Sequence, residues 1–342
     1  MNKIKYLLAL IVFLATSCEI ELKNDDTELP PELTVNALVS TDTILTATVT
    51  TATSFKEFTI DEYIDFADYE DKNFNDELVR LTVIPTTQVT ATVNGSDVYQ
   101  LKYNADNLNF QCDYRPKEGD VIKIEAAADG YPTASAQVVV PQHQRLEIVS
   151  CERLYDPMSY DIDTNTAQDT VARITLRITD PSSENNYYRL KVRSAGHLGS
   201  MYFFKDSFAS SDVIFKNVAL HKGYGGWAAG MSNVFCDYLI NGKTYDFVVE
   251  TRLRETRPVH SNGREGPEDK WVDIELQSIT PDFYHYLNSV WIYRITDRDA
   301  YSETVLIHSN VDNGWGIVGA LATERHLSLI HISEPTRRSY IS

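Results

Sequence analysis

The sequence predicts a mainly β protein, and two observations support this prediction. Apolar and polar residues alternate with a period of two through many short segments rich in Thr, Val, Ile and Tyr, which is typical of half-buried strands. Asn94-Gly95 stands between two such segments, and an Asn-Gly pair in that position is a strong hairpin signal because both residues tolerate positive φ. Only one segment has the spacing of a helix that packs on a sheet.

Residues 32–141 are predicted to form the first domain. Its strands are expected at 32–39, 45–53, 89–93, 98–103, 121–126 and 134–140. Six or seven strands over this length, with no clear helix among them, are typical of an immunoglobulin-like β-sandwich.

A second β-rich domain is predicted for residues 142–326. Its strands are expected at 146–153, 171–179, 187–193, 213–215, 244–253, 271–279 and 304–308. One helix is expected near 281–294, because Thr280 suits the N-cap, Pro281 suits the first helical position and Asp282 favours the helix dipole. The apolar residues that follow recur every three or four positions, which predicts that this helix packs across a sheet.

The charge balance excludes one class of function. Asp and Glu number 49 against 31 Lys and Arg, so the formal net charge is −18. Nucleic-acid binding requires basic side chains that neutralise phosphate, so no nucleic-acid partner is predicted. A hydrophobic content of 43% is ordinary for a chain that buries a core.

Residues 1–17 are predicted to be a lipoprotein signal peptide. Lys3 and Lys5 precede an apolar run that is too short to span a membrane, for which about 20 residues are needed. The run ends at Leu14-Ala15-Thr16-Ser17-Cys18, which resembles a bacterial lipobox, a motif whose cysteine is diacylated on sulfur and becomes the N-terminus. The predicted lipidation site is therefore Cys18; an ordinary signal peptide with an incidental cysteine is the alternative.

An acidic tether is predicted for residues 18–31. Residues 19–26, Glu-Ile-Glu-Leu-Lys-Asn-Asp-Asp, resemble the export signal that sends lipoproteins of Bacteroidota to the cell surface. Residues 27–31, which end in Pro30-Pro31, are expected to form a stiff spacer before the first strand. The expected location is the outer membrane, with the diacylglycerol on Cys18 anchored in the bilayer and the protein facing the exterior. A plain solvated tether is the alternative.

The last residues are not expected to belong to the fold. Residues 327–337, Leu-Ser-Leu-Ile-His-Ile-Ser-Glu-Pro-Thr-Arg, resemble the in-frame translation of a Nextera sequencing adapter. Residues 327–342 are therefore interpreted as an adapter-derived artefact, and no residue beyond His326 is assigned to a site.

Several short motifs, taken in order, resemble a family of Bacteroidota outer-membrane lipoproteins, the domain of unknown function family 4249 (DUF4249). After the lipobox, these motifs lie at 32–37, 118–120, 130–133, 140–141, 236–243, 278–286 and 309–319. The last motif departs from the family's Asn-Gly-x-Gly-Ile-Phe-Gly signature at Trp315 and Val318. The resemblance implies a place beside a TonB-dependent outer-membrane transporter and an accessory role in nutrient uptake.

Candidate contact residues are predicted in two segments. Residues 54–78 are rich in acids and aromatic residues, and a long loop of this kind is typical of a contact surface for a partner or for sugar rings. Residues 223–227 are rich in glycine. The candidate ligand or partner contacts are Phe58, Tyr63, Phe66, Tyr69, Tyr224 and Trp227. The alternative is a solvated acidic loop whose aromatic residues pack back onto the sandwich.

No catalytic residue, metal site or cofactor is predicted. The histidines lack ligand spacing, Gly-x-Ser-x-Gly does not occur, and the run Asp161-x-Asp163-x-Asn165 lacks the glycine and glutamate of a calcium loop. With Cys18 lipidated, three cysteines remain. Cys151–Cys236 is the predicted disulfide, and three buried thiols are the alternative.

Two functions from different classes follow. The first is a non-enzymatic accessory or binding module on the cell surface, beside a TonB-dependent transporter. The second is a surface hydrolase of glycan or peptide, which needs two carboxylates facing one cleft about 5–10 Å apart. The sequence favours the first.

Overall fold

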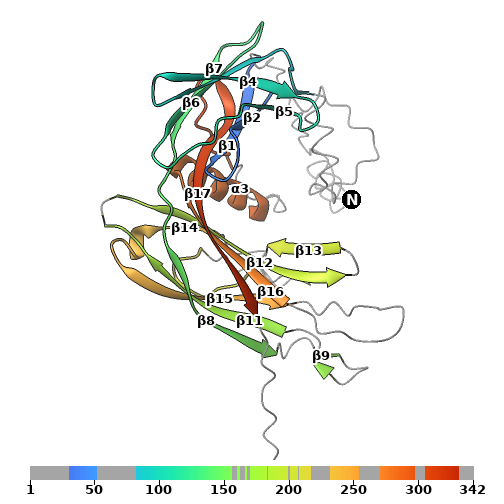
Figure 1. The fold of residues 1–342 in the computed structure, drawn as a ribbon, viewed down its shortest axis with the longest axis vertical. Coiled ribbons are helices and arrows are strands. Elements are labelled where there is room, and N and C mark those ends of the chain that lie inside the picture. The colour runs from blue at the N-terminus through green and yellow to red at the C-terminus, as the bar shows by residue number, and fades with distance from the viewer. Residues whose placement is uncertain are drawn as a thin grey trace, which may run out of the picture. The chain divides into compact units, whose positions relative to one another are not determined.

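Alternation of apolar and polar residues produces strands through most of the described chain, and the predicted mainly β fold is confirmed. The finer immunoglobulin-like topology stays a prediction. The computed structural model (Figure 1) describes residues 31–51, 82–155, 160–161, 166–167, 170–182, 184–198, 201–206, 208–216, 232–253, 270–296 and 305–330. Residues from Pro31 onward form one compact unit, which differs from the predicted division after residue 141.

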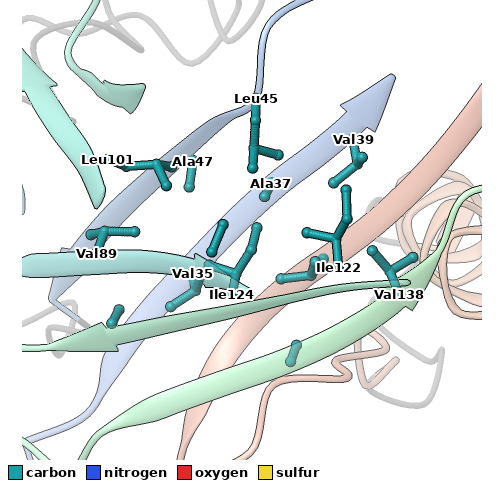
Figure 2. Packing of buried hydrophobic residues seen from close by; sticks show 14 of the residues in the cluster. Val35, Ala37, Val39, Leu45, Ala47, Val89, Leu101, Ile122, Ile124 and Val138 are labelled. Atoms are coloured by element: carbon teal, nitrogen blue, oxygen red, sulfur yellow. The ribbon is translucent and has the colours of Figure 1, made fainter. Parts of the chain in front are cut away.

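The first half is built on seven strands with one shared core. In chain order they are β1 (Leu33–Ser40), β2 (Thr46–Thr51), β3 (Gln88–Val93), β4 (Asp97–Asn104), β5 (Asn109–Gln111), β6 (Val121–Ala127) and β7 (Ala134–Val139), and they pair in the order β1-β2-β5-β4-β3-β6-β7. Alternate side chains, among them Val35, Leu101 and Ile124, point into the core (Figure 2). The hairpin at Asn94-Gly95 is confirmed, since residues 94–96 connect β3 to β4 and the first two of them have φ of 50° and 75°.

One late strand, β17 (Gly314–Ile330), completes this half. It pairs in parallel with the whole of β1, and its residues Val318 and Ala320 join the same core. Just before β17, Asp312 exchanges two backbone hydrogen bonds, 2.8 and 3.1 Å long, with Ser135 of β7. The core of the first half therefore includes residues from the end of the chain, and the predicted boundary separates these residues from it.

Glycines of β17 permit these close contacts. Gly316 has a φ of +108°, and a Cβ there would collide with the carbonyl of Val35 on β1. A Cβ at Gly319 would lie 2.8 Å from Phe283 of the helix described below. The glycine signature within 309–319 is thus required by the packing of β17.

The second half combines the rest of β17 with two groups of strands. β12 (Tyr187–Leu198) pairs with β13 (Met201–Asp206), β14 (Val234–Cys236) and β16 (Lys270–Ile279), and β16 pairs with β17. A three-stranded sheet has the order β15 (Thr244–Leu253), β11 (Thr170–Thr179) and β8 (Leu146–Tyr155), and β9 (Tyr160–Asp161) pairs with β10 (Thr166–Ala167). The apolar faces of the larger and the three-stranded sheets share a core that includes Tyr188, Leu190, Phe247 and Leu276.

The helix predicted near 281–294 is confirmed as α3 (Pro281–Thr296). The carbonyl of Thr280 accepts a hydrogen bond from Tyr284 N (3.0 Å). The Thr280 hydroxyl, expected as the helix cap, instead accepts a hydrogen bond from Ala320 N of β17 (3.2 Å). Phe283 and Tyr284 are buried in a cluster with Leu321 of β17. In the part of the chain that the structure describes, no helix is long and apolar enough to cross a membrane.

Two predicted strands are wrong. Residues 213–215 form a turn, in which Phe215 N donates to the carbonyl of Asp212 and Ile214 N donates to the Asp212 carboxylate. Residues 305–308 are not in a strand, and His308 N donates to Ser289 Oγ of α3 (3.0 Å). In both segments a side chain takes the place of a partner strand, which periodicity alone does not reveal.

The motif at 236–243 forms a structural turn. Asp237, which begins a short 3-10 helix (Asp237–Leu239), is buried and accepts hydrogen bonds from Asn186 N (2.8 Å) and Asn241 Nδ2 (3.2 Å). Gly242 has a φ of +69°, and its N–H donates to Asp180 (3.0 Å). These bonds fasten the turn before β15 to the segment before β12.

Candidate binding groove

A groove opens where β4 changes its pairing partner. Residues 97–101 of β4 pair with β3, whereas residues 102–104 pair with β5. The pairing with β5 ends at Lys102 and Gln111, although the antiparallel register would next place Cys112 opposite Leu101. Cys112 N instead donates to the carbonyl of Leu45 (3.2 Å), so the chain after β5 leaves the edge of β4. The space between β4 and residues 112–117 is the groove.

A buried carboxylate holds the wall of the groove formed by residues 112–117. Asp120 accepts hydrogen bonds from Tyr114 OH (2.6 Å), from Lys117 N (2.7 Å) and from Asn94 Nδ2 (2.9 Å). Burial by itself would raise the pKa of Asp120, but these three donors outweigh burial and hold the pKa below that of an ordinary aspartate. Residues 112–117 do not pair with β4, and hydrogen bonds to the ionised Asp120 side chain hold them in place instead.

The Glu118-Gly119-Asp120 motif places that carboxylate. Asp120 N donates to the carbonyl of Lys117 (3.0 Å), which closes a four-residue turn. Gly119, in the third position of the turn, has a φ of +85°, where a larger residue would be strained. The physical role of this motif is to aim Asp120 at the groove wall.

Three tyrosines form the aromatic part of the groove, whose volume is about 980 Å³. Tyr99 and Tyr114 pack against each other with ring centroids 4.6 Å apart, and Tyr103 packs on Phe110 with centroids 5.3 Å apart. All three tyrosines are half-buried, so the core fixes them while they still line the groove. The other lining residues are Gln100, Lys102, Asn104, Ala105, Gln111, Cys112, Asp113, Arg115 and Lys117.

The side chains that line the groove carry a net positive charge, whereas the chain as a whole is strongly negative. Lys102, Arg115 and Lys117 are exposed, and they share the groove with one acidic residue, Asp113. Among the described residues, no carboxylate forms an ion pair with these three cations. Arg115 donates one hydrogen bond to the carbonyl of Asp42 (3.3 Å). In a chain of net charge −18, the side chains that line the groove include more cations than acids, and the charge of Lys117 is partly balanced by Asp120 behind the wall.

The titratable groups of the groove favour binding over proton transfer. Burial raises the pKa of the Cys112 thiol, so little thiolate forms at neutral pH. Burial and the hydrogen bond to Asp120 together raise the pKa of Tyr114, which keeps that hydroxyl protonated. Fixed rings, amides and cations around a concave surface are typical of a ligand site.

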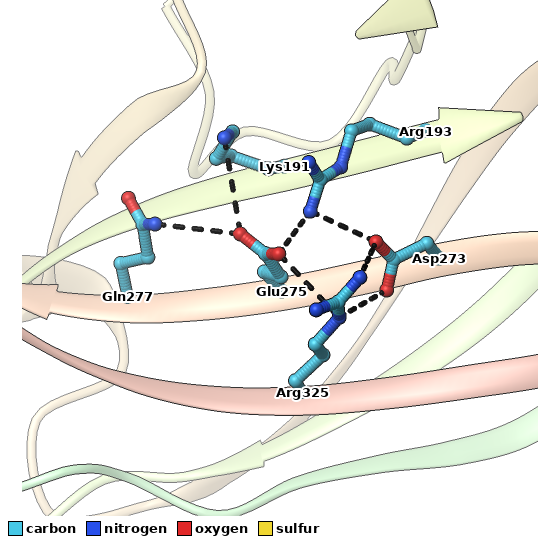
Figure 3. Close-up of polar contacts among 6 residues, drawn as sticks. All are labelled: Lys191, Arg193, Asp273, Glu275, Gln277 and Arg325. Atoms are coloured by element: carbon cyan, nitrogen blue, oxygen red, sulfur yellow. Dashed lines mark hydrogen bonds and ion pairs between the residues drawn. The ribbon is translucent and has the colours of Figure 1, made fainter. Parts of the chain in front are cut away.

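A second polar cluster, the sheet-face network, lies across β12, β16 and β17 (Figure 3). Asp273 and Glu275 of β16 are buried, and their cross-strand neighbours on β12 are Arg193 and Lys191. Arg325 of β17 binds Asp273 through two hydrogen bonds, of 2.9 and 2.7 Å. Arg193 contacts both carboxylates. Three cations thus surround two buried acids.

The sheet-face network does not supply the carboxylate pair that a hydrolase needs. Each of the four oxygens of Asp273 and Glu275 has a cationic or amide donor. A general acid needs a carboxyl that carries a proton and reaches a substrate, whereas these two are held by cations. In the described part of the chain, no group of three or more His, Cys, Asp and Glu side chains is placed to hold a metal ion.

Most of the sequence-predicted site residues lie outside the described residues. They are Cys18, Phe58, Tyr63, Phe66, Tyr69, Tyr224 and Trp227. The predicted disulfide is not formed in the structure, since Cys151, Cys236 and Cys112 are all free. Cys151 lies on β8 of the three-stranded sheet, whereas Cys236 lies on β14, and the two pack on different apolar clusters. Spacing along the chain gives no sign of this separation.

Sequence reasoning misses the groove. Tyr99, Lys102 and Tyr103 stand in a predicted strand, and a strand's own pattern does not show where its partner leaves it. The signal that could have found the groove is the run Cys112-Asp113-Tyr114-Arg115-Pro116-Lys117. This run is aromatic and basic, and it precedes a Glu-Gly-Asp turn in an acidic chain.

The protein is thus of the mainly β class. Its two halves share strand β17, and its first half carries a groove lined by tyrosines and cations. The family model for a domain of unknown function, DUF4249, matches residues 17–326. The chain belongs to this family. The matched region ends directly before the segment interpreted as adapter-derived, although residues 327–330 of that segment form the end of β17 and pair with β16. Comparisons with curated proteins and with solved structures found no match.

Proposed function

We propose that the protein is a lipid-anchored accessory protein of the outer membrane that binds a ligand in the groove, beside a TonB-dependent transporter. The groove carries this proposal, because its tyrosine rings pack against the core and because Lys102 and Arg115 form no ion pair with a carboxylate among the described residues. Ligand sites are typically formed before the ligand binds, and a small number of polar groups in them set the orientation of the ligand.

The positions and ion pairs of the carboxylates favour a binding role over hydrolysis. The groove contains one lining carboxylate, Asp113, and the paired carboxylates Asp273 and Glu275 are occupied by cations. A glycoside hydrolase needs two carboxylates on opposite sides of a bound substrate. The described residues offer no such pair in the groove.

The proposed location depends on the sequence of the N-terminus and on the family. The lipobox ending at Cys18 and the acidic residues after it resemble a surface-export signal. An anchor of this kind would hold a strongly acidic protein at a membrane without a spanning segment. The transporter partner is the expectation that the family resemblance carries.

Anchoring is tested with the full chain in native cells. We expect radiolabelled palmitate to be incorporated into the protein and not into the Cys18→Ala variant, and we expect protease added to intact cells to remove the anchored protein. Equal labelling of both variants contradicts lipidation at Cys18. Protection from protease in intact cells contradicts a location on the exterior.

The accessory role is tested by purification of the tagged, membrane-anchored protein in mild detergent, followed by mass spectrometry. Recovery of a TonB-dependent transporter in an amount comparable with the bait supports the proposal. Recovery of the bait alone, under conditions that keep known outer-membrane complexes intact, overturns it.

A further inference from the structure

We propose that the ligand of the groove is an acidic saccharide, one whose pyranose rings carry carboxylates. This inference rests on the proposed binding role and names the chemistry of its ligand. It follows from three features of the groove: its tyrosine rings, its amides and the excess of cations over acids among its lining residues.

The rings provide surfaces for sugar stacking. A pyranose has a face of C–H groups that packs on an aromatic ring, and Tyr99, Tyr103 and Tyr114 all line the groove. Tyr99 packs against Tyr114 and Tyr103 packs on Phe110, so binding would cost little side-chain entropy.

The amides provide hydroxyl partners. A carboxamide both donates and accepts hydrogen bonds, as a sugar hydroxyl requires. Asn104 Oδ1 already accepts from Asp106 N (2.9 Å) and Gln100 Nε2 donates to the carbonyl of Val89 (3.0 Å), which fixes both side chains. The remaining donor of Asn104 and the remaining acceptor of Gln100 are left for a ligand.

The cations select an acidic sugar over a neutral one. Lys102, Arg115 and Lys117 outnumber the single acid Asp113 in the groove. Arg115 presents a planar fork that matches a carboxylate, and its bond to the carbonyl of Asp42 sets its position. A neutral saccharide would leave these three charges unused.

The charge of the rest of the chain limits how long a polyanion the groove tolerates. Screening confines the attraction of three cations to about 8–10 Å at ordinary ionic strength. Beyond that distance a densely charged polymer meets a chain of net charge −18 and is repelled. A short, sparsely charged saccharide satisfies the groove without this cost, and nucleic acid does not.

Calorimetric titration of the detergent-solubilised, full-length protein with trigalacturonic acid tests this inference, with maltotriose as the neutral counterpart. We expect trigalacturonic acid to bind and maltotriose to bind at least about tenfold more weakly, since each lost charged contact is worth about this factor. We expect Lys102→Gln with Arg115→Gln to remove most of the preference. Lys123→Gln with Arg145→Gln removes the same two charges outside the groove, on β6 and directly before β8, and is expected to leave the affinity unchanged.

Three results overturn the inference: no binding of trigalacturonic acid, equal affinity for both saccharides, or equal loss in the groove and control variants. Such a failure is distinguishable from failure of the proposed function. If the transporter is recovered with the bait while trigalacturonic acid does not bind, only the ligand class is wrong. If the transporter is not recovered and trigalacturonic acid does not bind, the proposed accessory role is wrong as well.

Discussion

The groove and the sheet-face network contain the same kinds of cation in opposite situations. In the network, Lys191, Arg193 and Arg325 meet two buried acids on the neighbouring strand β16. In the groove, Lys102 and Arg115 have no acidic partner among the described residues. Where strand pairing continues, cross-strand neighbours satisfy the charges; where pairing stops, the charges stay available. Continuity of pairing therefore separates structural charge from binding charge in this fold.

The largest expected effect comes from breaking the network at its most buried member. Asp273→Asn removes one of the two carboxylates that Arg193 and Arg325 share, so we expect a loss of about 3–5 kcal/mol in the free energy of unfolding, measured in urea. Asp246→Asn is the matched control. Asp246 of β15 also binds an arginine on the neighbouring strand, Arg177 of β11, but at an exposed position. A much smaller loss is expected there, and equal losses would contradict a structural role that depends on burial.

An intermediate effect is expected from the groove wall. Asp120→Asn weakens the bonds from Tyr114 and Lys117 N, so we expect a loss of about 2 kcal/mol at neutral pH. The folded-state pKa of Asp120 is lowered, so its contribution is complete above the ordinary aspartate pKa of about 4 and is lost as the pH falls through the folded value.

The stabilities of the wild type and Asp120→Asn should therefore begin to converge as the pH falls below about 4. They should meet once the pH is below the lowered folded-state pKa of Asp120, where the carboxyl is neutral in both folded and unfolded chains. Thermal unfolding followed from neutral to acid pH measures this difference. A gap between the two proteins that stays constant, or widens in acid, would show that Asp120 does not act as an ionised anchor.

The smallest expected effect concerns thiol reactivity. Burial raises the pKa of both Cys112 and Cys151, so at pH 8 both should alkylate more slowly than an exposed cysteine with its ordinary pKa of about 8.5. Cys112 lines the groove and Cys151 does not. Saturating trigalacturonic acid should slow alkylation of Cys112 alone, as measured by mass spectrometry of labelled peptides. Equal protection of both thiols would point to a global stabilisation instead of occupancy of the groove.

The parts of the fold that depend on local pattern are predictable from the sequence. The Asn94-Gly95 hairpin and α3 follow from turn chemistry, capping and periodicity, and both are confirmed. The parallel pairing of β17 with β1 joins residues almost 300 positions apart, and local pattern carries no information about such a partner. A boundary after residue 141, as predicted, would separate β17 from the core that it shares with β1.

The site is predictable in kind but not in place. The sequence predicts aromatic contact residues within 54–78, because aromatic residues are dense in that segment. The groove instead arises from a pairing event, the departure of Cys112 from β4 toward Leu45, and only the folded register reveals it. The carboxylates Asp273 and Glu275 stand among many acids in the sequence, and their burial beside three cations appears only when β12, β16 and β17 are aligned.

One paired measurement tests the central claim that groove cations serve a ligand and network cations serve the fold. Arg115→Gln and Arg325→Gln remove the same charge from the two regions, and each variant is examined for unfolding in urea and for affinity toward trigalacturonic acid. We expect Arg115→Gln to keep its stability and lose affinity about tenfold or more, and Arg325→Gln to lose stability while its folded fraction binds as before. The opposite assignment, or a loss of both properties in both variants, would contradict the claim.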